Sequence, residues 1–281
     1  MDSHQYCQER AAASGSSFYY SFVFLPQDAR RAITAFYALC RELDDVVDEC
    51  HDRQVALAKL DWWREEIGRF AAGIPEHPAT RALHDTPQGR IIPPALLLEI
   101  VDGMAMDLDH PRYPDFKSLN LYCYRVAGVV GEVAAAIFSG QRSEDDRDVR
   151  RYAHELGLAF QLTNIIRDVG EDARLGRIYL PQDELARFGV AEADILNGRG
   201  TPEFQALMQF QFDRAAAHYE SAFAALPDRA RRAQRPGLVM AAIYRTLLDE
   251  IRHAGFPVLR TRVSLTPLRK LWLAGKTWLF P

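Results

Sequence analysis

The apolar residues of this chain recur mainly at intervals of three and four positions, which is the period of a helix with one buried face. The pattern predicts helices over 27–50, 54–72, 94–108, 116–139, 147–172, 201–226 and 237–254, after a short first helix that ends near residue 13. We find neither the alternation of apolar and polar residues that indicates a β-sheet nor a repeat of solenoid length. The pattern therefore predicts an all-α protein.

The C-terminal part of the predicted helix over 147–172 has a polar face. At about 100° per residue, Asn164, Asp168 and Asp172 fall in one line along the helix. Gln161 lies beside them, and the apolar residues of the same stretch fall roughly opposite. This helix is therefore expected to pack with one side and to present oxygen atoms with the other.

The predicted helix over 27–50 has a second acidic face, because Asp44 and Asp48 are one turn apart and Arg41 lies on their side. Carboxylates at this spacing repel one another unless a cation lies between them. Magnesium prefers oxygen ligands and commonly combines one or two carboxylates with substrate phosphates. Each face alone is compatible with a solvated helix surface, but the two together favour a shared site for several Mg²⁺ ions. The expected ligands are Asp44, Asp48, Asn164, Asp168 and Asp172.

Two further features of the central helices bear on a binding site. A third acidic cluster, Asp102, Asp107 and Asp109, has weaker spacing, so we expect it to face solvent or the rim of a pocket rather than a metal. The predicted helix over 116–139 contains small residues that lower helix propensity unless another element must approach closely. They indicate either tight helix packing or the wall of a long, lipid-shaped pocket.

The composition is that of an ordinary globular protein. The 281 residues are 48% hydrophobic and the net charge is −4, which argues against a nucleic-acid partner. The four cysteines show neither a metal-binding nor a disulfide spacing. The first residues lack the pattern of a secretory signal, and no continuous apolar run reaches about 18 residues, so we expect a cytoplasmic protein.

The last stretch, 265–281, mixes tryptophan and leucine with Arg269, Lys270 and Lys276. Such a segment is typical of a helix that lies in a membrane interface, and burial against the protein's own helices is the alternative. An interfacial tail would place the protein peripherally on the inner face of the membrane.

Several blocks of sequence together resemble one known family. They are SSFY at 16–19, DDVVD at 44–48, YCYRVAGVVGE at 122–132, NIIRDVGED at 164–172 and GRIYLP at 176–181. This combination resembles the squalene and phytoene synthase family, and the similarity extends from about residue 6 to about residue 262. Within the family, residues 11–22 are most similar to the presqualene diphosphate synthases of bacterial hopanoid pathways.

The resemblance implies one isoprenoid-synthase-type helical bundle over residues 1–281, with a central cavity where the two acidic faces meet. It implies head-to-head condensation of two farnesyl diphosphates to presqualene diphosphate, with release of diphosphate and a proton, for squalene and hopanoid synthesis. Magnesium ions would stabilise the leaving diphosphate. Because the sequence has no glycine-rich dinucleotide fingerprint, no nicotinamide cofactor is expected. Downstream squalene-forming enzymes would be partners that receive the product.

Three other functions are compatible with the same motifs. A phytoene synthase would act on the longer geranylgeranyl diphosphate in a deeper pocket, and a squalene synthase would carry the reaction further. A non-catalytic assembly factor on the same fold is disfavoured, because all five expected oxygen ligands are present.

The resemblance and the residue types together suggest which side chains bind the substrate and which accept the proton. Hydroxyls and backbone amides can bind diphosphate, and arginines near the acidic helix can donate to phosphate oxygens. The expected proton acceptors are Tyr122, Tyr124, Tyr244 or the released diphosphate. The substrate-binding candidates are Ser14, Ser16, Ser17, Phe18, Tyr37, Arg41, Gln161, Asn164, Arg167, Arg177, Tyr179 and Arg262.

Overall fold

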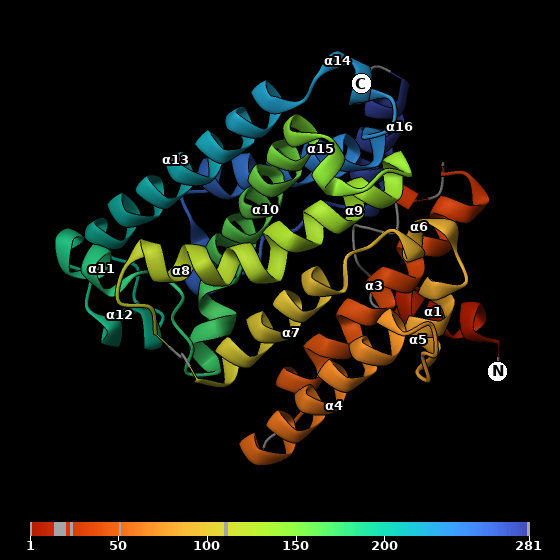
Figure 1. Ribbon diagram of the computed structural model, residues 1–281. Coiled ribbons are helices and arrows are strands. Elements are labelled where there is room, and N and C mark those ends of the chain that lie inside the picture. Colours follow the sequence, from red (N-terminus) through yellow and green to blue (C-terminus); the bar gives the residue numbers. More distant parts are fainter. Residues whose placement is uncertain (1, 14–20, 23–24, 51, 110–111, 280–281) are drawn as a thin grey trace.

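The computed structural model describes residues 2–13, 21–22, 25–50, 52–109 and 112–279 of the chain. Within these ranges the regular structure is helical, apart from one parallel bridge between Arg112 and Ile178. The helices pack as one bundle (Figure 1). The prediction of a single-domain all-α fold is therefore confirmed. Four of the substrate-binding candidates, Ser14, Ser16, Ser17 and Phe18, lie outside the described residues.

The long helices follow the predicted pattern, with bounds that differ by at most two residues from the predicted ones. They are α3 (Gln27–Asp48), α4 (Arg53–Ala71), α7 (Pro94–Asp109), α10 (Arg147–Arg174), α13 (Pro202–Ala225) and α15 (Arg235–His253). The shorter helices are α1 (Ser3–Ala13), α5 (Pro78–His84), α6 (Pro87–Arg90), α11 (Gln182–Phe188), α12 (Glu192–Leu196), α14 (Asp228–Arg231) and α16 (Pro267–Leu279). Two 3₁₀ turns, η2 (Ser143–Asp145) and η3 (Pro257–Leu259), join them. The sequence did not predict α5, α6, α11, α12 and α14, because helices of four to seven residues are too short to show a period.

Side-chain caps fix where several helices begin. At the start of α10, the Asp146 carboxylate accepts hydrogen bonds from the backbone amides of Asp148 and Val149, both at 3.2 Å. Asp52 caps α4 in the same way, and the Thr201 hydroxyl caps α13. These side chains satisfy amides that have no partner in the first helical turn.

The long apolar helix predicted over 116–139 is interrupted. It consists of α8 (Phe116–Cys123), a π-helical turn η1 (Tyr124–Gly128) and α9 (Val129–Ser139). A π-helical turn holds more residues than an α-helical one, and such turns often occur at functional sites. By length and composition this segment could cross a membrane, but 50% of its most apolar window is buried inside the bundle. We therefore describe it as a core segment.

Glycines allow this segment to touch α10. A Cβ atom on Gly131 would lie 2.4 Å from the carbonyl oxygen of Ala153, and one on Gly157 would lie 2.3 Å from the carbonyl oxygen of Ala127. Only glycine fits at either position, because side-chain atoms do not approach a backbone so closely. Ala127 and Gly131 also border the central cavity. These small residues therefore permit close packing and also form part of a cavity wall.

The hydrophobic core has two parts. The N-terminal core is formed by residues of α1, α3, α4, α5 and α7, the C-terminal core by residues of α8, α10, α13 and α15, and α9 contributes to both. Helix α10 packs against α9, α13 and α15 (Figure 1). Phe36 and Met104 of the N-terminal core and Leu156 and Met240 of the C-terminal core border the same cavity. The cavity therefore lies between the two cores.

Candidate active site

A cavity of about 510 Å³ is bordered by α3, α7, α9, α10 and α15. Its apolar and polar parts follow one another along α10. Ala153 and Phe160 border it in the first part of the helix, and Asn164 and Asp172 border it in the last part. At 1.5 Å per residue, the ends of this series are roughly 28 Å apart. The site is thus long, with apolar walls toward one end and carboxylates at the other.

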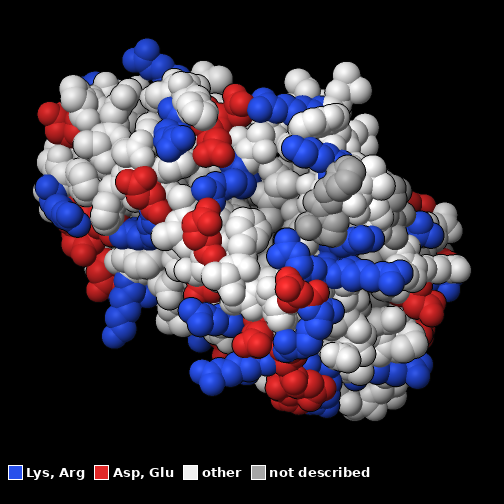
Figure 2. Space-filling model, turned by 90° about the horizontal axis from the view of Figure 1, so that it is seen from above, with Lys and Arg blue, Asp and Glu red and all other residues white. Residues whose placement is uncertain are grey.

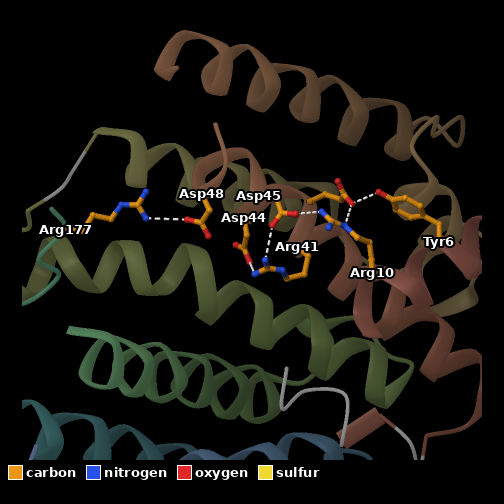
Figure 3. A network of polar contacts seen from close by, with 8 residues as sticks. Tyr6, Arg10, Arg41, Asp44, Asp45, Asp48 and Arg177 are labelled. Carbon is orange, nitrogen blue, oxygen red and sulfur yellow. Dashed lines mark hydrogen bonds and ion pairs between the residues drawn. The ribbon is translucent and has the colours of Figure 1, made fainter. Parts of the chain in front are cut away.

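The first acidic face belongs to a network of ion pairs (Figure 3). The Arg41 guanidinium donates to Asp44 at 3.2 Å and to Asp45 at 2.9 Å. Asp45 is also paired with Arg10, which joins α1 to α3. Arg41, Asp44 and Asp48 border the cavity. Of the two carboxylates of this face that were predicted to bind metal, Asp44 is therefore paired with Arg41 and Asp48 with Arg177.

On the second acidic face, Asp168 is engaged by two arginines. The Nε atom of Arg167 donates to it at 2.7 Å and the Nε atom of Arg262 at 3.1 Å. Arg262 comes from the segment between η3 and α16, 94 positions after Asp168. Both arginines border the cavity. Asp168 would have to exchange these partners in order to become a metal ligand.

Asn164 carries an oxygen atom without a partner. Its Oδ1 atom is buried and accepts no hydrogen bond, while its Nδ2 atom lies 3.4 Å from Oε1 of Gln161. A buried polar atom left unsatisfied costs about 1–3 kcal/mol. An oxygen in this position suits a hard cation, which takes carbonyl oxygens as ligands.

The two acidic faces meet through Arg177, whose Nη1 atom lies 3.5 Å from Asp48. Burial, with a further contribution from neighbouring carboxylates, raises the pKa of Asp44 to about 7 although a nearby arginine opposes the shift. Burial and the neighbouring Asp168 likewise raise the pKa of Asp172 to about 7. The site therefore disfavours the charged forms of both carboxylates, and a bound cation would reverse this.

The described residues include no group of three Asp, Glu, His or Cys side chains that could by itself hold a metal ion. The residues nevertheless fit hard cations, because carboxylates with raised pKa border the same cavity from two helices and the Asn164 oxygen needs a partner. Asp44 and Asp48 on α3 and Asn164 and Asp172 on α10 could hold such ions. Phosphate oxygens of a substrate would complete their coordination.

Asp107 was expected at the solvent or at a pocket rim, and the structure places it in the cavity wall. Its two carboxylate oxygens accept hydrogen bonds from the hydroxyls of Tyr122, at 2.8 Å, and Tyr179, at 2.9 Å. The two tyrosine rings are stacked 5.4 Å apart. Burial raises the pKa of Asp107 to about 6, although the two hydroxyls oppose the shift. Helical spacing could not predict this position of Asp107 in the cavity wall, because its hydrogen-bond partners come from other parts of the chain.

The other two members of the third acidic cluster form ion pairs with α4. Asp102 accepts from Arg64 at 2.7 Å, and Asp109 accepts from Arg53 at 3.0 Å. Neither borders the cavity. Their side chains are partly exposed, as was expected for positions that face solvent.

The three tyrosines proposed as proton acceptors are not equivalent. Tyr122 and Tyr244 border the cavity, and Tyr124 does not. Residues two positions apart on a helix point about 200° away from each other, so Tyr122 and Tyr124 face different neighbours. The Tyr124 ring lies 5.4 Å from His154. Tyr244 shares a hydrogen bond with Arg167. The remaining substrate-binding candidates that border the cavity are Tyr37, Gln161, Arg177 and Tyr179.

Comparison with known proteins identifies the family of this chain. Residues 11–269 match the squalene/phytoene synthase family. The chain belongs to this family. Its members are prenyltransferases, and the characteristic reaction of the family is the head-to-head condensation of prenyl diphosphates.

Relatives and solved structures agree with this assignment. The chain is 38% identical to a 15-cis-phytoene synthase of Synechococcus elongatus and 40% identical to a phytoene synthase of Arthrospira platensis, in each case over 96% of this chain and 90% of the relative. A crystal structure of a dehydrosqualene synthase superposes with a TM-score of 0.82 at 28% identity, covering 99% of this chain and 96% of that one. Squalene synthase HpnC from Alicyclobacillus acidocaldarius superposes with a TM-score of 0.77 at 28% identity, covering 90% and 94%. The predicted isoprenoid-synthase-type fold is thereby confirmed.

Proposed function

We propose that this protein joins two molecules of farnesyl diphosphate head to head to form presqualene diphosphate, with Mg²⁺ bound between the two acidic faces. The observation that carries this proposal is the arrangement of the cavity. Carboxylates and arginines from α3 and α10 border one part of a long space, and apolar residues of both cores border the rest. This arrangement suits a substrate with a charged head and a long hydrocarbon tail.

In the first step, the bond between C1 of one prenyl chain and its diphosphate oxygen breaks. When bound, the ions would neutralise the departing diphosphate. Arg41, Arg167 and Arg177 border the cavity and can donate N–H groups to the diphosphate oxygens. In the structure these arginines bind carboxylates of the site, so diphosphate would compete for them.

The allylic cation must then meet the double bond of the second substrate before it meets water. Phe36, Met104 and Phe160 belong to the cavity wall, and such residues exclude water. Aromatic faces also stabilise a cation without reacting with it. The apolar part of the cavity therefore protects the step in which the new carbon–carbon bond forms.

Loss of a proton from the coupled chain closes the cyclopropane ring, and one of the two diphosphates stays on the product. We assign the proton acceptor to Tyr122, because it borders the cavity and its hydroxyl donates to Asp107. The tyrosine oxygen can accept a proton while its own proton moves to the Asp107 carboxylate. The released diphosphate is the alternative acceptor.

Phytoene formation from geranylgeranyl diphosphate is the second candidate function, because the relatives at 38% and 40% identity are named phytoene synthases. We favour farnesyl diphosphate because residues 11–22 resemble the presqualene diphosphate synthases. A separate enzyme of the squalene-forming class would then have to ionise the product a second time.

The test is to incubate the purified protein with Mg²⁺ and either farnesyl or geranylgeranyl diphosphate, with and without reduced nicotinamide, and to identify the lipids by mass spectrometry. We expect presqualene diphosphate from farnesyl diphosphate under both conditions. Squalene or hydroxysqualene as the main product would contradict the proposed end point. A preference for geranylgeranyl diphosphate with formation of phytoene would establish the second candidate instead.

A further inference from the structure

The first helix, α1, contacts the first acidic face through one arginine (Figure 3). The Nε atom of Arg10 donates to Glu42 at 2.6 Å, and its Nη2 atom donates to Asp45. One turn earlier on α1, the Tyr6 hydroxyl donates to Glu42 as well. The side chains of Glu42 and Asp45 are only 17% and 15% exposed. Arg10 therefore lies against two largely buried carboxylates of α3.

The burial of these carboxylates distinguishes the Arg10 pairs from most ion pairs of the protein. On the face of the molecule that Figure 2 shows, Lys and Arg side chains lie beside Asp and Glu side chains. Exposed pairs of this kind contribute little to stability. A largely buried carboxylate, in contrast, costs free energy unless a cation stays beside it. We therefore expect Arg10 to remain beside Asp45.

Asp45 lies next to the cavity without bordering it. Arg41, Asp44 and Asp48 border the cavity, and of the residues that the structure describes neither Asp45 nor Arg10 does. On a helix, Asp45 points about 100° away from Asp44. One oxygen of Asp45 accepts from Nη2 of Arg41 at 2.9 Å, and the other accepts from Arg10. Asp45 thus shares its charge between one arginine that borders the cavity and one that does not.

The strength with which Asp45 holds Arg41 decides where the Arg41 guanidinium points. Arg41 donates through Nη1 to Asp44 and through Nη2 to Asp45. When Asp44 binds a cation, Arg41 keeps Asp45 as a partner, and its Nη1 group becomes free to donate to a phosphate oxygen. Without Arg10, the full charge of Asp45 would act on Arg41 and favour a bidentate pair. Such a pair would turn both N–H groups away from the cavity.

We propose that Arg10 is a positioning residue for the diphosphate: by neutralising Asp45, it keeps the Arg41 guanidinium available to phosphate oxygens in the cavity. Arg10 itself does not touch the substrate and acts through the other two residues. Hydrogen bonds to Glu42 and to Asp45 raise the pKa of Arg10, so it stays charged at the pH of any assay. The inference rests on the proposed function only in that the substrate carries a diphosphate, whatever the length of its prenyl chain.

The experiment measures the binding of inorganic diphosphate to the full chain, in the presence of Mg²⁺, by isothermal titration calorimetry. Arg10→Gln should weaken binding about tenfold. Arg10→Lys should weaken it less, because lysine keeps the charge. The double variant Arg10→Gln/Asp45→Asn should recover most of the loss, because the uncompensated charge is gone. Arg64→Gln is the matched control, since the Arg64 side chain is 35% exposed against 34% for Arg10 and also pairs with two carboxylates, Asp61 and Asp102.

Two further measurements separate positioning from a purely structural role. Arg10→Gln should raise the KM for the prenyl diphosphate by a larger factor than it lowers kcat. Mg²⁺ alone should raise the melting temperature of Arg10→Gln at least as much as that of the wild type, because this variant has one positive charge fewer among the carboxylates. A smaller Mg²⁺ shift together with weaker diphosphate binding would indicate damage to the acidic face and would overturn the proposal.

Three other results would also overturn it. Arg10→Gln could bind diphosphate as tightly as the wild type, or Arg64→Gln could lose the same affinity as Arg10→Gln. Alternatively, Asp45→Asn could fail to restore binding in the double variant. The products that the wild type forms from farnesyl or geranylgeranyl diphosphate test the proposed function, and they have no bearing on these comparisons of diphosphate binding.

Discussion

The guanidinium of Arg177 lies 3.5 Å from the carboxylate of Asp48, which is 129 positions earlier in the chain. This pair joins the turn after α10 to α3 and so links the two acidic faces. Arg177 also opposes the rise in the pKa of both Asp107 and Asp172. The Arg177 guanidinium therefore lies among carboxylates of three helices, namely Asp48 of α3, Asp107 of α7 and Asp172 of α10.

Replacing Arg177 by Gln should impair binding of the diphosphate. The variant loses a charge-assisted hydrogen bond, worth about 1.5–3 kcal/mol, so kcat/KM should fall by about one to two orders of magnitude. Steady-state kinetics with varied prenyl diphosphate would measure this. Arg174→Gln is the control, since Arg174 is exposed three residues earlier, and it should behave like the wild type. Equal losses in both variants would show that Arg177 has no specific role.

Stabilisation by Mg²⁺ should depend on pH. The pKa values of Asp44 and Asp172 are raised to about 7, so between about pH 4 and 7 the folded protein holds more protons than the unfolded chain. These two groups therefore lower the free energy of unfolding as pH rises through that window. Mg²⁺ binds the ionised carboxylates, and we expect it to raise the melting temperature more at pH 8 than at pH 6.

Calorimetry with Mg²⁺ or with excess chelator at each pH would test this expectation. The Asp44→Asn, Asp168→Asn and Asp172→Asn variants should each lose turnover by orders of magnitude, while Asp61→Asn on the surface of α4 should not. Full turnover in chelator, or an equal melting shift at both pH values, would rule out a metal at these carboxylates.

Asn164→Leu should separate a structural role from a ligand role. Because Oδ1 of Asn164 is buried without a partner, a leucine of similar size should leave the free energy of unfolding within about 1 kcal/mol of the wild type or raise it. Turnover and the melting shift caused by Mg²⁺ should both decrease. A large loss of stability, measured by urea denaturation, would instead indicate that Asn164 supports the fold.

Asp107→Asn should lower kcat by about 10- to 100-fold with little change in KM, because the amide cannot accept a proton passed on through Tyr122. In this variant, kcat should no longer decrease toward acidic pH. Asp102→Asn, five residues earlier on α7 and paired with Arg64, is the matched control. If the pH profile of kcat stayed unchanged and KM rose by a similar factor instead, the role of Asp107 would be only to hold the two tyrosines in place.

The contact between α10 and η1 should tolerate no side chain at Gly157. A Cβ atom there would lie 2.3 Å from the Ala127 carbonyl oxygen, so Gly157→Ala should destabilise the protein by about 1–3 kcal/mol or more. Gly68→Ala inside α4 meets nothing within 4 Å and should stabilise the protein by about 0.5–1 kcal/mol. Urea denaturation compares the two, and a similar small effect of both changes would refute the close approach.

The sequence by itself determined the helices and their faces. Asn164 and Asp172 lie on one face of their helix because of the helical period, which is a local property of the chain. The division of each helix into a packed side and a polar side is local in the same sense. The same holds for Asp44 and Asp48. Family motifs added the expectation that these two faces meet, and both do border one cavity in the structure.

Tertiary structure decided which residues complete the site. Asp107 enters the cavity because two tyrosines, 15 and 72 positions away, donate to it. Arg262 reaches Asp168 from the segment before α16, 94 positions further along the chain. These outcomes depend on contacts between elements far apart in the chain. A helical period carries no information about such contacts, because it records only which side of a helix a residue occupies and not what that side meets.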